Sequence, residues 1–257
     1  MSYINNNKAG TLLKLRVVIP EADNKLRKRC MDAAEAKYGI PLPDAVRERL
    51  EEGLLAIKFS GHASQYLIGV MLAEQSLAEG YPVITRGMIG SAFSSHLCGI
   101  TTVNPLPAHY WCPNCHYFEL INGRDYKIMG YDLPDKTCPK CGSLLNAEGA
   151  DIEPEVLMGI KLDWEPNIIL NVAAEVRSKL VYFLKDTFGE GCVFRAGVKT
   201  VLKDGSVRRN VHPGGVFIIP QAADIRGITD IRDEIPEDDF GLPVTELDYH
   251  EIDGIMK

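Results

Sequence analysis

The sequence predicts an α+β fold that carries a small cysteine-rich insertion. Three observations lead to this prediction: residues 21–79 show the apolar spacing of helices, residues 112–141 contain two close pairs of cysteines, and residues 191–249 contain strand patterns separated by turns. The chain has 257 residues, of which 46% are hydrophobic and 25% are charged. This composition is typical of a globular protein with one large domain or two small ones, and it excludes extensive disorder.

The first third of the chain is expected to be helical after one short strand. Residues 12–19 form an apolar run that ends before a proline, which indicates a strand. Helices are expected over residues 21–38, 45–58 and 64–79, and Asp44 is expected to cap the N-terminus of the second. We expect these helices to cover a core rather than to carry chemistry.

A glycine-containing turn after these helices is a candidate phosphate site. A short strand leads into Arg86, Gly87, Gly90 and Ser91, and a helix is expected over residues 91–97. The backbone amides of such a turn, the positive end of the helix and the arginine together suit a phosphate group. Most turns of this kind bind no ligand, so a plain turn is the alternative interpretation.

Two pairs of cysteines give the strongest chemical signal in the sequence. Cys112 and Cys115 form one C-x-x-C pair, Cys138 and Cys141 form another, and 22 residues separate the pairs. Two such turns aim four thiolates at one point, which suits a structural Zn²⁺ ion. A redox C-x-x-C motif is the alternative, but it occurs singly and opens a helix. His116 is a further potential ligand, and we expect it to be a surface side chain instead.

The remaining cysteines and the aromatic residues beside the insertion are expected to serve packing. Cys30, Cys98 and Cys192 have no partner in the sequence pattern and are expected to be buried thiols. Tyr110 and Trp111 precede the first cysteine pair. We expect them to pack under the insertion rather than to stack on a nucleic-acid base.

The C-terminal part is expected to combine one helix with several strands. The pattern predicts a buried strand over 167–172 and a helix over 173–188. Strands are expected over 191–201 and 215–220, with a hairpin turn at 203–206 between them. From residue 221 an acidic, loop-like tail is expected, until an alternating segment at 244–249. The chain is therefore divided into a helical part at 1–109 that includes the glycine turn, a zinc-ribbon insertion at 110–144, and a sheet core with an acidic C-terminal segment at 145–257.

Charge is distributed unevenly along the chain. The net charge is −7, but residues 173–212 carry +4 and residues 222–257 carry −8. A uniformly basic nucleic-acid-binding surface is excluded, whereas a local basic patch is not. The basic block at 173–212 is one possible anion-binding surface, for which the acidic block at 222–257 would compete with the anion. The alternative is that both blocks are solvated faces whose charges partly neutralise each other. The sequence shows neither a membrane-spanning apolar run nor a secretory signal, so a soluble cytoplasmic protein without membrane contact is expected.

Several segments resemble a known family. The chain resembles the PolC-type catalytic subunits of bacterial DNA polymerase III from about residue 13 to residue 257, in the segments Thr85–Phe93, Gly99–Tyr110, both cysteine pairs, Gly130–Lys136, Gly159–Asn171, Phe194–Gly197 and His212–Gly215. The resemblance implies a nucleotidyltransferase-type palm, with a mixed sheet, flanking helices and an inserted zinc ribbon. It also implies that Gly90 and Ser91 contact an incoming nucleoside triphosphate, and that Arg86 belongs to the same loop.

The chain departs from the family at the catalytic metal site. The chemistry implied by the resemblance uses two Mg²⁺ ions held by an Asp-x-Asp pair on one face of a strand. Asn167 and Ile169 stand at those positions here, and neither residue supplies a carboxylate. The family's third aspartate lies beyond the segment that resembles residues 249–257, and a longer fingers segment stands where this chain has residues 198–211. We therefore expect no catalytic residues and no Mg²⁺ site.

Three functions follow from these observations. The first is a non-catalytic palm relative that binds a nucleoside triphosphate, primer–template DNA or a replisome protein. The second is an active nucleotidyltransferase that uses relocated acids, for which Asp163, Glu165, Asp238 and Asp239 are the candidates. The third is a purely structural or interaction scaffold, in which the glycine turn binds nothing.

Overall fold

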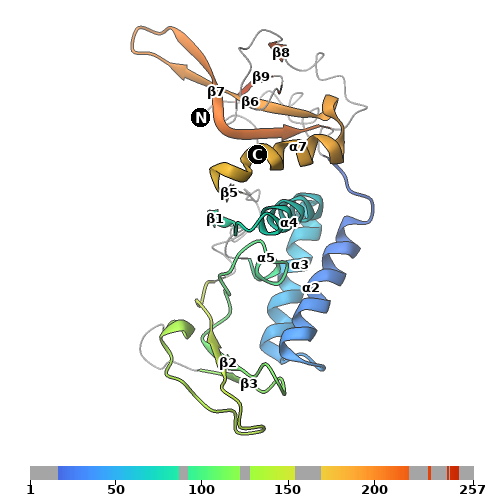
Figure 1. The fold of residues 1–257 in the computed structure, drawn as a ribbon, viewed down its shortest axis with the longest axis vertical. Coiled ribbons are helices and arrows are strands. Elements are labelled where there is room, and N and C mark those ends of the chain that lie inside the picture. Colours follow the sequence, from blue (N-terminus) through green and yellow to red (C-terminus); the bar gives the residue numbers. More distant parts are fainter. Residues whose placement is uncertain are drawn as a thin grey trace. The chain divides into compact units, whose positions relative to one another are not determined.

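The chain forms two compact units, one made of residues 20–171 and the other of residues 1–19 and 172–257. A computed structural model describes residues 17–86, 92–121, 128–153, 169–219, 231–232, 242 and 244–248 (Figure 1). Helices and strands are mixed in it, in agreement with the α+β expectation at this coarse level.

Three long helices build the core of the first unit. They are α2 (Ala22–Tyr38), α3 (Asp44–Ser60) and α4 (Ala63–Ala78), each within two residues of the expected bounds. Helix α2 contacts both α3 and α4. The apolar residues at helical spacing meet in one buried cluster, which also takes in the short helix α5 (Phe93–Leu97). We call α2, α3, α4 and α5 the helical core.

Two expectations for the N-terminal part need correction. Asp44 is not an N-cap, because the cap position belongs to Pro43 and Asp44 is already the first residue of α3. Its carboxylate accepts a hydrogen bond from Arg47 at 2.7 Å and lies in the first turn, where a negative charge favours the helix dipole. The expected strand over residues 12–19 lies mostly outside the described residues, and residues 17–19 do not form a strand.

The first unit also contains a two-stranded sheet. Strand β1 (Ile84–Arg86) pairs antiparallel with β5 (Ile169–Asn171). The three residues of β5 are half-buried, so the expectation of a buried strand was too strong for this segment. Residues 167 and 168 of the expected strand lie outside the described residues.

The cysteine-rich segment forms a small lobe on the first unit. Its sheet has the order β3-β2-β4, with β2 (His109–Trp111) in the centre between β3 (Phe118–Leu120) and β4 (Asn146–Glu148). A 3-10 turn, η2 (Gly130–Asp132), lies against β4. A Cβ atom at Gly130 would lie 1.8 Å from the carbonyl oxygen of Glu148, so only glycine fits there. We call residues 109–148 the four-cysteine lobe.

The second unit consists of a helix and a four-stranded sheet. Helix α7 (Ala174–Phe188) is followed by the 3-10 turn η3 (Glu190–Cys192), and the strand order in the sheet is β7-β6-β9-β8. The strands are β6 (Val193–Val201), β7 (Val207–Ile218), β8 (Ile231–Arg232) and β9 (Val244–Asp248). Strands β6 and β7 form the long hairpin in Figure 1, with the turn at the expected place. Strand β7 starts earlier than expected, and β8 lies in a segment expected to be a loop.

The turn of this hairpin is closed by its own hydrogen bonds. The Leu202 amide donates to the Ser206 carbonyl at 2.8 Å, and the Ser206 amide and hydroxyl both donate to the Asp204 carboxylate. Gly205 has a φ of 81°, which favours glycine.

Within the described part of the chain, every helix is too short or too polar to cross a membrane.

Candidate metal centre and nucleotide loop

Each cysteine pair sits in a tight turn closed by backbone hydrogen bonds. In the first turn, directly after β2, the Cys112 amide donates to the Tyr117 carbonyl at 2.8 Å, and the His116 amide donates to Cys112. In the second turn, the Cys138 amide donates to the Ser143 carbonyl at 2.7 Å. The two turns repeat the same arrangement, and this arrangement directs both thiols of each pair to one side.

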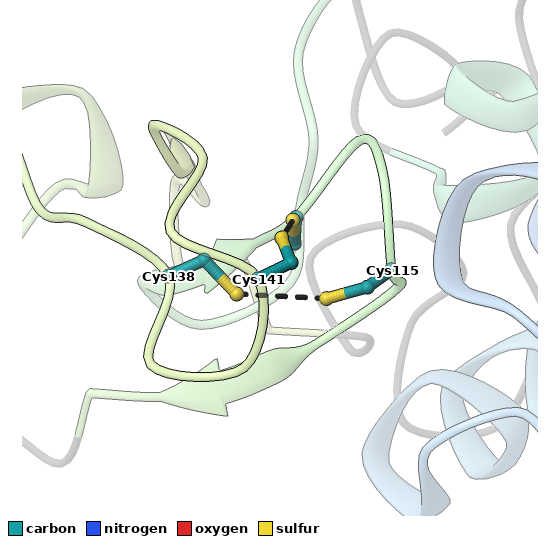
Figure 2. Close-up of side chains that lie close together, drawn as sticks. Cys115, Cys138 and Cys141 are labelled. Carbon is teal, nitrogen blue, oxygen red and sulfur yellow. Dashed lines mark hydrogen bonds between the residues drawn. The ribbon is translucent and has the colours of Figure 1, made fainter.

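The two turns bring all four sulfur atoms together. The Sγ atoms of Cys112, Cys115, Cys138 and Cys141 lie within 4.8 Å of one another. The Sγ atoms of Cys112 and Cys141 are 3.4 Å apart, and those of Cys115 and Cys138 are 3.5 Å apart (Figure 2). A tetrahedral Zn²⁺ site with Zn–S bonds of about 2.3 Å has S···S edges of about 3.8 Å. The four thiols therefore fit a zinc ion in both donor chemistry and spacing.

The thiols of the cluster differ in how readily they ionise. Hydrogen bonds with the side chain and backbone of Ser143 lower the pKa of Cys141 to about 6. A backbone hydrogen bond from Tyr117 lowers the pKa of Cys115, but burial and the neighbouring thiols outweigh it and raise the pKa to about 12. Thiolates crowded together repel one another, so a cation between them is needed before all four can lose their protons.

The lobe has little apolar core of its own. Among its described residues, the buried cluster consists of Tyr110, Leu145 and two of the cysteines, Cys112 and Cys138. Tyr110 is 3% exposed and donates its hydroxyl to the Pro134 carbonyl, which confirms that it packs inside the lobe. A segment with so few buried side chains depends on its cross-links for stability.

His116 is not part of the sulfur cluster. Its side chain is exposed, as expected, and its Nδ1 atom lies 3.3 Å from the Lys37 carbonyl oxygen of helix α2. The lobe therefore contacts the helical core through this residue rather than binding a metal with it.

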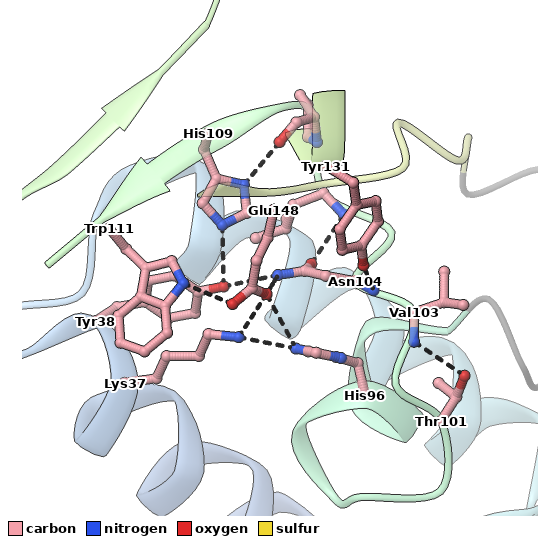
Figure 3. A network of polar contacts seen from close by, with 12 residues as sticks. Lys37, Tyr38, His96, Thr101, Val103, Asn104, His109, Trp111, Tyr131 and Glu148 are labelled. Carbon is pink, nitrogen blue, oxygen red and sulfur yellow. Dashed lines mark hydrogen bonds and ion pairs between the residues drawn. The ribbon is translucent and has the colours of Figure 1, made fainter. Parts of the chain in front are cut away.

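A partly buried carboxylate joins the lobe to the helical core. Glu148, on β4, accepts hydrogen bonds from Lys37 at 2.7 Å, from Trp111 Nε1 at 2.6 Å and from Asn104 Nδ2 at 3.0 Å (Figure 3). Burial raises the pKa of this carboxyl, but Lys37 and the other donors outweigh it, so the pKa is lowered. The Lys37 ammonium also donates to His96 Nε2 at 3.0 Å. Glu148 thus links β4 to α2 and, through Lys37, to α5.

A second set of hydrogen bonds continues this network. Asn104, which is fully buried, donates to the Tyr38 hydroxyl at 2.9 Å. That hydroxyl lies 3.3 Å from His109 Nε2, while His109 Nδ1 donates to the Pro107 carbonyl at 2.7 Å. Burial lowers the pKa of His109, in keeping with a neutral ring that accepts from tyrosine. We call these linked residues, including Lys37, His96, Trp111 and Glu148, the junction network.

The sequence did not point to the junction network. Lys37, Asn104 and Glu148 lie in three different elements and form no motif, so their meeting depends on how the elements pack.

The candidate nucleotide loop is described only in part. The backbone of Arg86 ends β1, where it pairs with Ile169 of β5. Gly87, Gly90 and Ser91 lie outside the described residues, as do Asn167 and the candidate relocated acids Asp163, Glu165, Asp238 and Asp239. The short helix after the loop begins at Phe93 rather than at Ser91.

The basic block is only partly on the surface. Arg177 and Lys179 of α7 are exposed, and so are Lys203 and Arg208 of the hairpin. Arg195 on β6 is 5% exposed, which corrects the expectation that the whole block faces solvent. The exposed cations of the hairpin stand beside the exposed apolar residues Val201, Leu202 and Val207.

Comparisons with known proteins agree with the resemblance. Residues 24–212 match the family described as the bacterial DNA polymerase III alpha NTPase domain. The chain is 37% identical over 269 residues to "DNA polymerase III PolC-type" of Caldanaerobacter subterraneus subsp. tengcongensis. The aligned region covers 92% of this chain and 19% of the relative. It is 36% identical to the protein of the same name from Thermotoga petrophila, over 93% of this chain and 20% of the relative. The Staphylococcus aureus (strain Mu3) protein is also 36% identical, over 92% of this chain and 19% of the relative.

The chain spans about a fifth of the length of these relatives. The family match covers well over half of the chain, from α2 to β7. The chain therefore belongs to the bacterial DNA polymerase III alpha family and resembles its PolC-type members over almost all of its length.

Proposed function

We propose that this chain is a non-catalytic, cytoplasmic relative of the PolC-type palm that binds a nucleoside triphosphate at the turn of residues 86–91 without transferring it to DNA. The observation that carries the proposal is the pairing of Arg86 with Ile169 in the β1–β5 sheet. This register supports a position for residue 169 beside the start of the nucleotide loop. An isoleucine there supplies no metal ligand.

The physical reason is the requirement of phosphoryl transfer for metal ions. Two divalent cations must bridge the attacking and leaving oxygens, and carboxylates on one face of a strand hold them. Asn167 offers a neutral oxygen and Ile169 offers none, so the divalent cations lose their ligands at this strand. Binding of the triphosphate depends on loop amides and Arg86, which the chain keeps.

A structural zinc ion is part of the same proposal. Four cysteines complete a tetrahedral shell and leave no position open for a substrate or a water molecule. We assign this ion to Cys112, Cys115, Cys138 and Cys141 in an insertion at residues 110–144, between the segments 1–109 and 145–257. The zinc ion would stabilise the lobe, and its chemistry would not enter a reaction.

Primer–template DNA is the partner best supported by the second unit. The hairpin exposes Lys203 and Arg208, while the carboxylate of Asp204 is engaged by Ser206. Exposed cations of this kind meet phosphates, although the acidic segment at 222–257 argues for weak and salt-sensitive contact. A replisome protein is the alternative partner.

Primer extension is the direct test of the missing chemistry. The zinc-loaded chain is incubated with a primer–template and all four nucleoside triphosphates, first with Mg²⁺ and then with Mn²⁺. We expect no extension, together with a rise in melting temperature on addition of a triphosphate, because a ligand that binds only the native state stabilises it. Incorporation would contradict the proposal and favour an enzyme with relocated acids, which substitution of Asp163 and Glu165 would then test.

DNA binding is tested separately by fluorescence anisotropy of the labelled primer–template across a salt series. We expect saturable binding that weakens steeply with salt, and a weaker affinity with a smaller salt slope for the double variant Lys203→Ala, Arg208→Ala. Lys28→Ala, an exposed lysine of α2, is the matched control. Absence of binding at low salt would exclude DNA as a partner, and if triphosphates also leave the melting temperature unchanged, the scaffold function would be favoured.

A further inference from the structure

Two cysteines outside the four-cysteine lobe lie in contact within the helical core. Cys30 lies in the middle of α2, and Cys98 directly follows the last residue of α5. Their Sγ atoms are 3.3 Å apart, although 68 positions separate them in the sequence. Cys30 is 0% exposed and Cys98 is 3% exposed. The sequence pattern predicted buried thiols without partners, and the contact between them arises from the packing of α2 against α5.

We infer that Cys30 and Cys98 form a redox-active dithiol that hydrogen peroxide closes to a disulfide, which covalently links α2 to the end of α5. The inference is independent of the proposed function, because it requires neither nucleotide nor DNA binding. It rests on the sulfur–sulfur contact and on the chemistry of the groups around it.

The surroundings of the two thiols make them chemically unequal. The contact with Cys30 lowers the pKa of Cys98, burial opposes this effect, and the neighbouring Arg29 guanidinium lowers the pKa further. The contact with Cys98 and burial both raise the pKa of Cys30. Arg29 is held in place by an ion pair with Glu74 of α4. The thiolate is the reactive form, and Cys98 serves as the nucleophile in the reaction that follows; an initial attack by Cys30 leads to the same disulfide.

The reaction balances with peroxide as the oxidant. The Cys98 thiolate attacks one peroxide oxygen, the O–O bond breaks, and the leaving hydroxide takes up a proton to become water. Cys98 is then a sulfenic acid. The Cys30 sulfur attacks the Cys98 sulfur, the S–O bond breaks, and the hydroxyl leaves as a second water molecule with the proton of Cys30. The two thiols lose two electrons and the peroxide gains them.

The local structure allows the sulfur atoms to approach bonding distance. A disulfide requires a separation of about 2.05 Å, so the sulfur atoms must move closer by somewhat more than 1 Å. Cys30 is held in a helix of 17 residues, whereas Cys98 lies at the end of a helix of five residues. Gly99 follows with a φ of 78°, and a Cβ atom added there would meet no atom within 4 Å, so we expect the end of α5 to be the side that adjusts. We choose hydrogen peroxide as the oxidant because the pair is buried and peroxide is little larger than water.

Peptide mapping under non-reducing conditions tests the inference directly. The full-length, zinc-loaded protein is treated with hydrogen peroxide, quenched, alkylated and digested with trypsin. We expect a linkage between the peptide of residues 30–37 and the peptide of residues 87–124, with the loss of two hydrogen atoms from the intact protein. The linkage should disappear on treatment with dithiothreitol. The oxidised protein should also have the higher melting temperature, because the cross-link restricts the unfolded chain.

Variants identify which cysteine of the longer peptide takes part, because that peptide also contains Cys112 and Cys115. Cys98→Ser should abolish the linkage, and Cys98→Ala is the second variant in case the first folds poorly. Cys192→Ser, which removes a buried thiol of the other unit, is the matched control and should leave the linkage intact. Persistence of the linkage in Cys98→Ser would overturn the inference. So would unlinked Cys30 and Cys98 in wild-type protein after the zinc cysteines have been oxidised.

Discussion

The helical core and the four-cysteine lobe are stabilised in different ways, although both belong to the first unit. The helical core buries a continuous apolar cluster from three long helices, with Leu26, Leu50 and Ile57 at most 1% exposed. Among its described residues, the buried cluster of the lobe consists of Tyr110, Leu145 and two of the four clustered cysteines. Burial of apolar surface can hold the first region without help, whereas the second needs a cross-link.

The lobe is attached to the helical core by both apolar and polar contacts. Trp111 and Phe118 of the lobe pack against the apolar cluster of the helical core. The junction network adds a polar attachment through Glu148, which accepts hydrogen bonds from both sides of the boundary. Lys37 adds a cation–π contact, with its Nζ atom 5.0 Å from the centre of the Trp111 ring. Stability of the lobe should therefore depend on the metal first and on the junction second.

Removal of the metal should give the largest effect. Cys138→Ser, or a strong chelator, should unfold the four-cysteine lobe, because zinc binding to such a site contributes about 10–16 kcal/mol. Hydrogen exchange should show loss of protection across residues 109–148, while circular dichroism should show that α2, α3 and α4 remain helical. Cys98→Ala is the control, since it removes a cysteine of the helical core and should keep one zinc ion per chain. A fully protected lobe in Cys138→Ser would show that the two regions do not differ in this way.

Neutralisation of the junction carboxylate should have a smaller effect. Glu148→Gln leaves the Lys37 ammonium partly buried without its counter-ion, and both side chains are less than 20% exposed. We expect a loss of about 3 kcal/mol in the free energy of unfolding of the first unit. Urea unfolding followed by fluorescence measures this change, in a Trp164→Phe background that leaves Trp111 as the only tryptophan.

The control for this variant is a glutamate in an exposed pair. Glu51 pairs with Arg27 between α3 and α2, and both side chains are more than 40% exposed. Glu51→Gln should cost less than about 1 kcal/mol. Equal losses for the two variants would mean that the junction network does not connect the regions more strongly than a surface ion pair does.

Acid should weaken the junction over a defined pH window. Burial and the Lys37 cation lower the pKa of His96 from 6.5 to about 4, so the folded state keeps this ring neutral. Between pH 6.5 and 4 the unfolded chain binds the proton and the folded chain does not, so stability falls as the pH decreases. The expected loss from this group is about 2 kcal/mol in the free energy of unfolding.

Comparison of wild-type protein with His96→Gln isolates this contribution from the protonation of zinc ligands, which acts in both proteins. Urea midpoints measured from pH 7.5 to 4 should converge as the pH falls, since only the wild-type protein loses the stability that depends on His96. Parallel curves would show that His96 does not titrate in this window.

Local patterns in the sequence were sufficient to predict the three long helices, the hairpin turn and the paired turns of the lobe, but not every strand. The three long helices follow from apolar residues that recur with the helical period, and the paired turns of the lobe follow from cysteine spacing. The cap of α3 was predicted wrongly, because Asp44 is a good N-cap residue by type while Pro43 takes that position in the fold. The length of β7 was also underestimated, since pairing with β6 extends it through polar residues.

Contacts between distant segments could not be predicted. Cys30 and Cys98 meet only because α2 packs against α5, and the members of the junction network come from different elements. The pairing of Arg86 with Ile169 likewise depends on tertiary structure. The resemblance implies a carboxylate where this chain has Ile169, and the register between β1 and β5 pairs that position with Arg86 at the start of the candidate loop.

The strands at the base of the four-cysteine lobe lie side by side, with His109 paired to Glu148. The chain therefore leaves the helical core and returns to it at nearly the same point. A segment with adjoining ends can be lengthened, shortened or exchanged without separating the elements on either side of it. During evolution the lobe can therefore be replaced by another segment while the helical core is kept. In protein engineering, the connection between β2 and β4 is the place at which a different metal-binding module can be inserted.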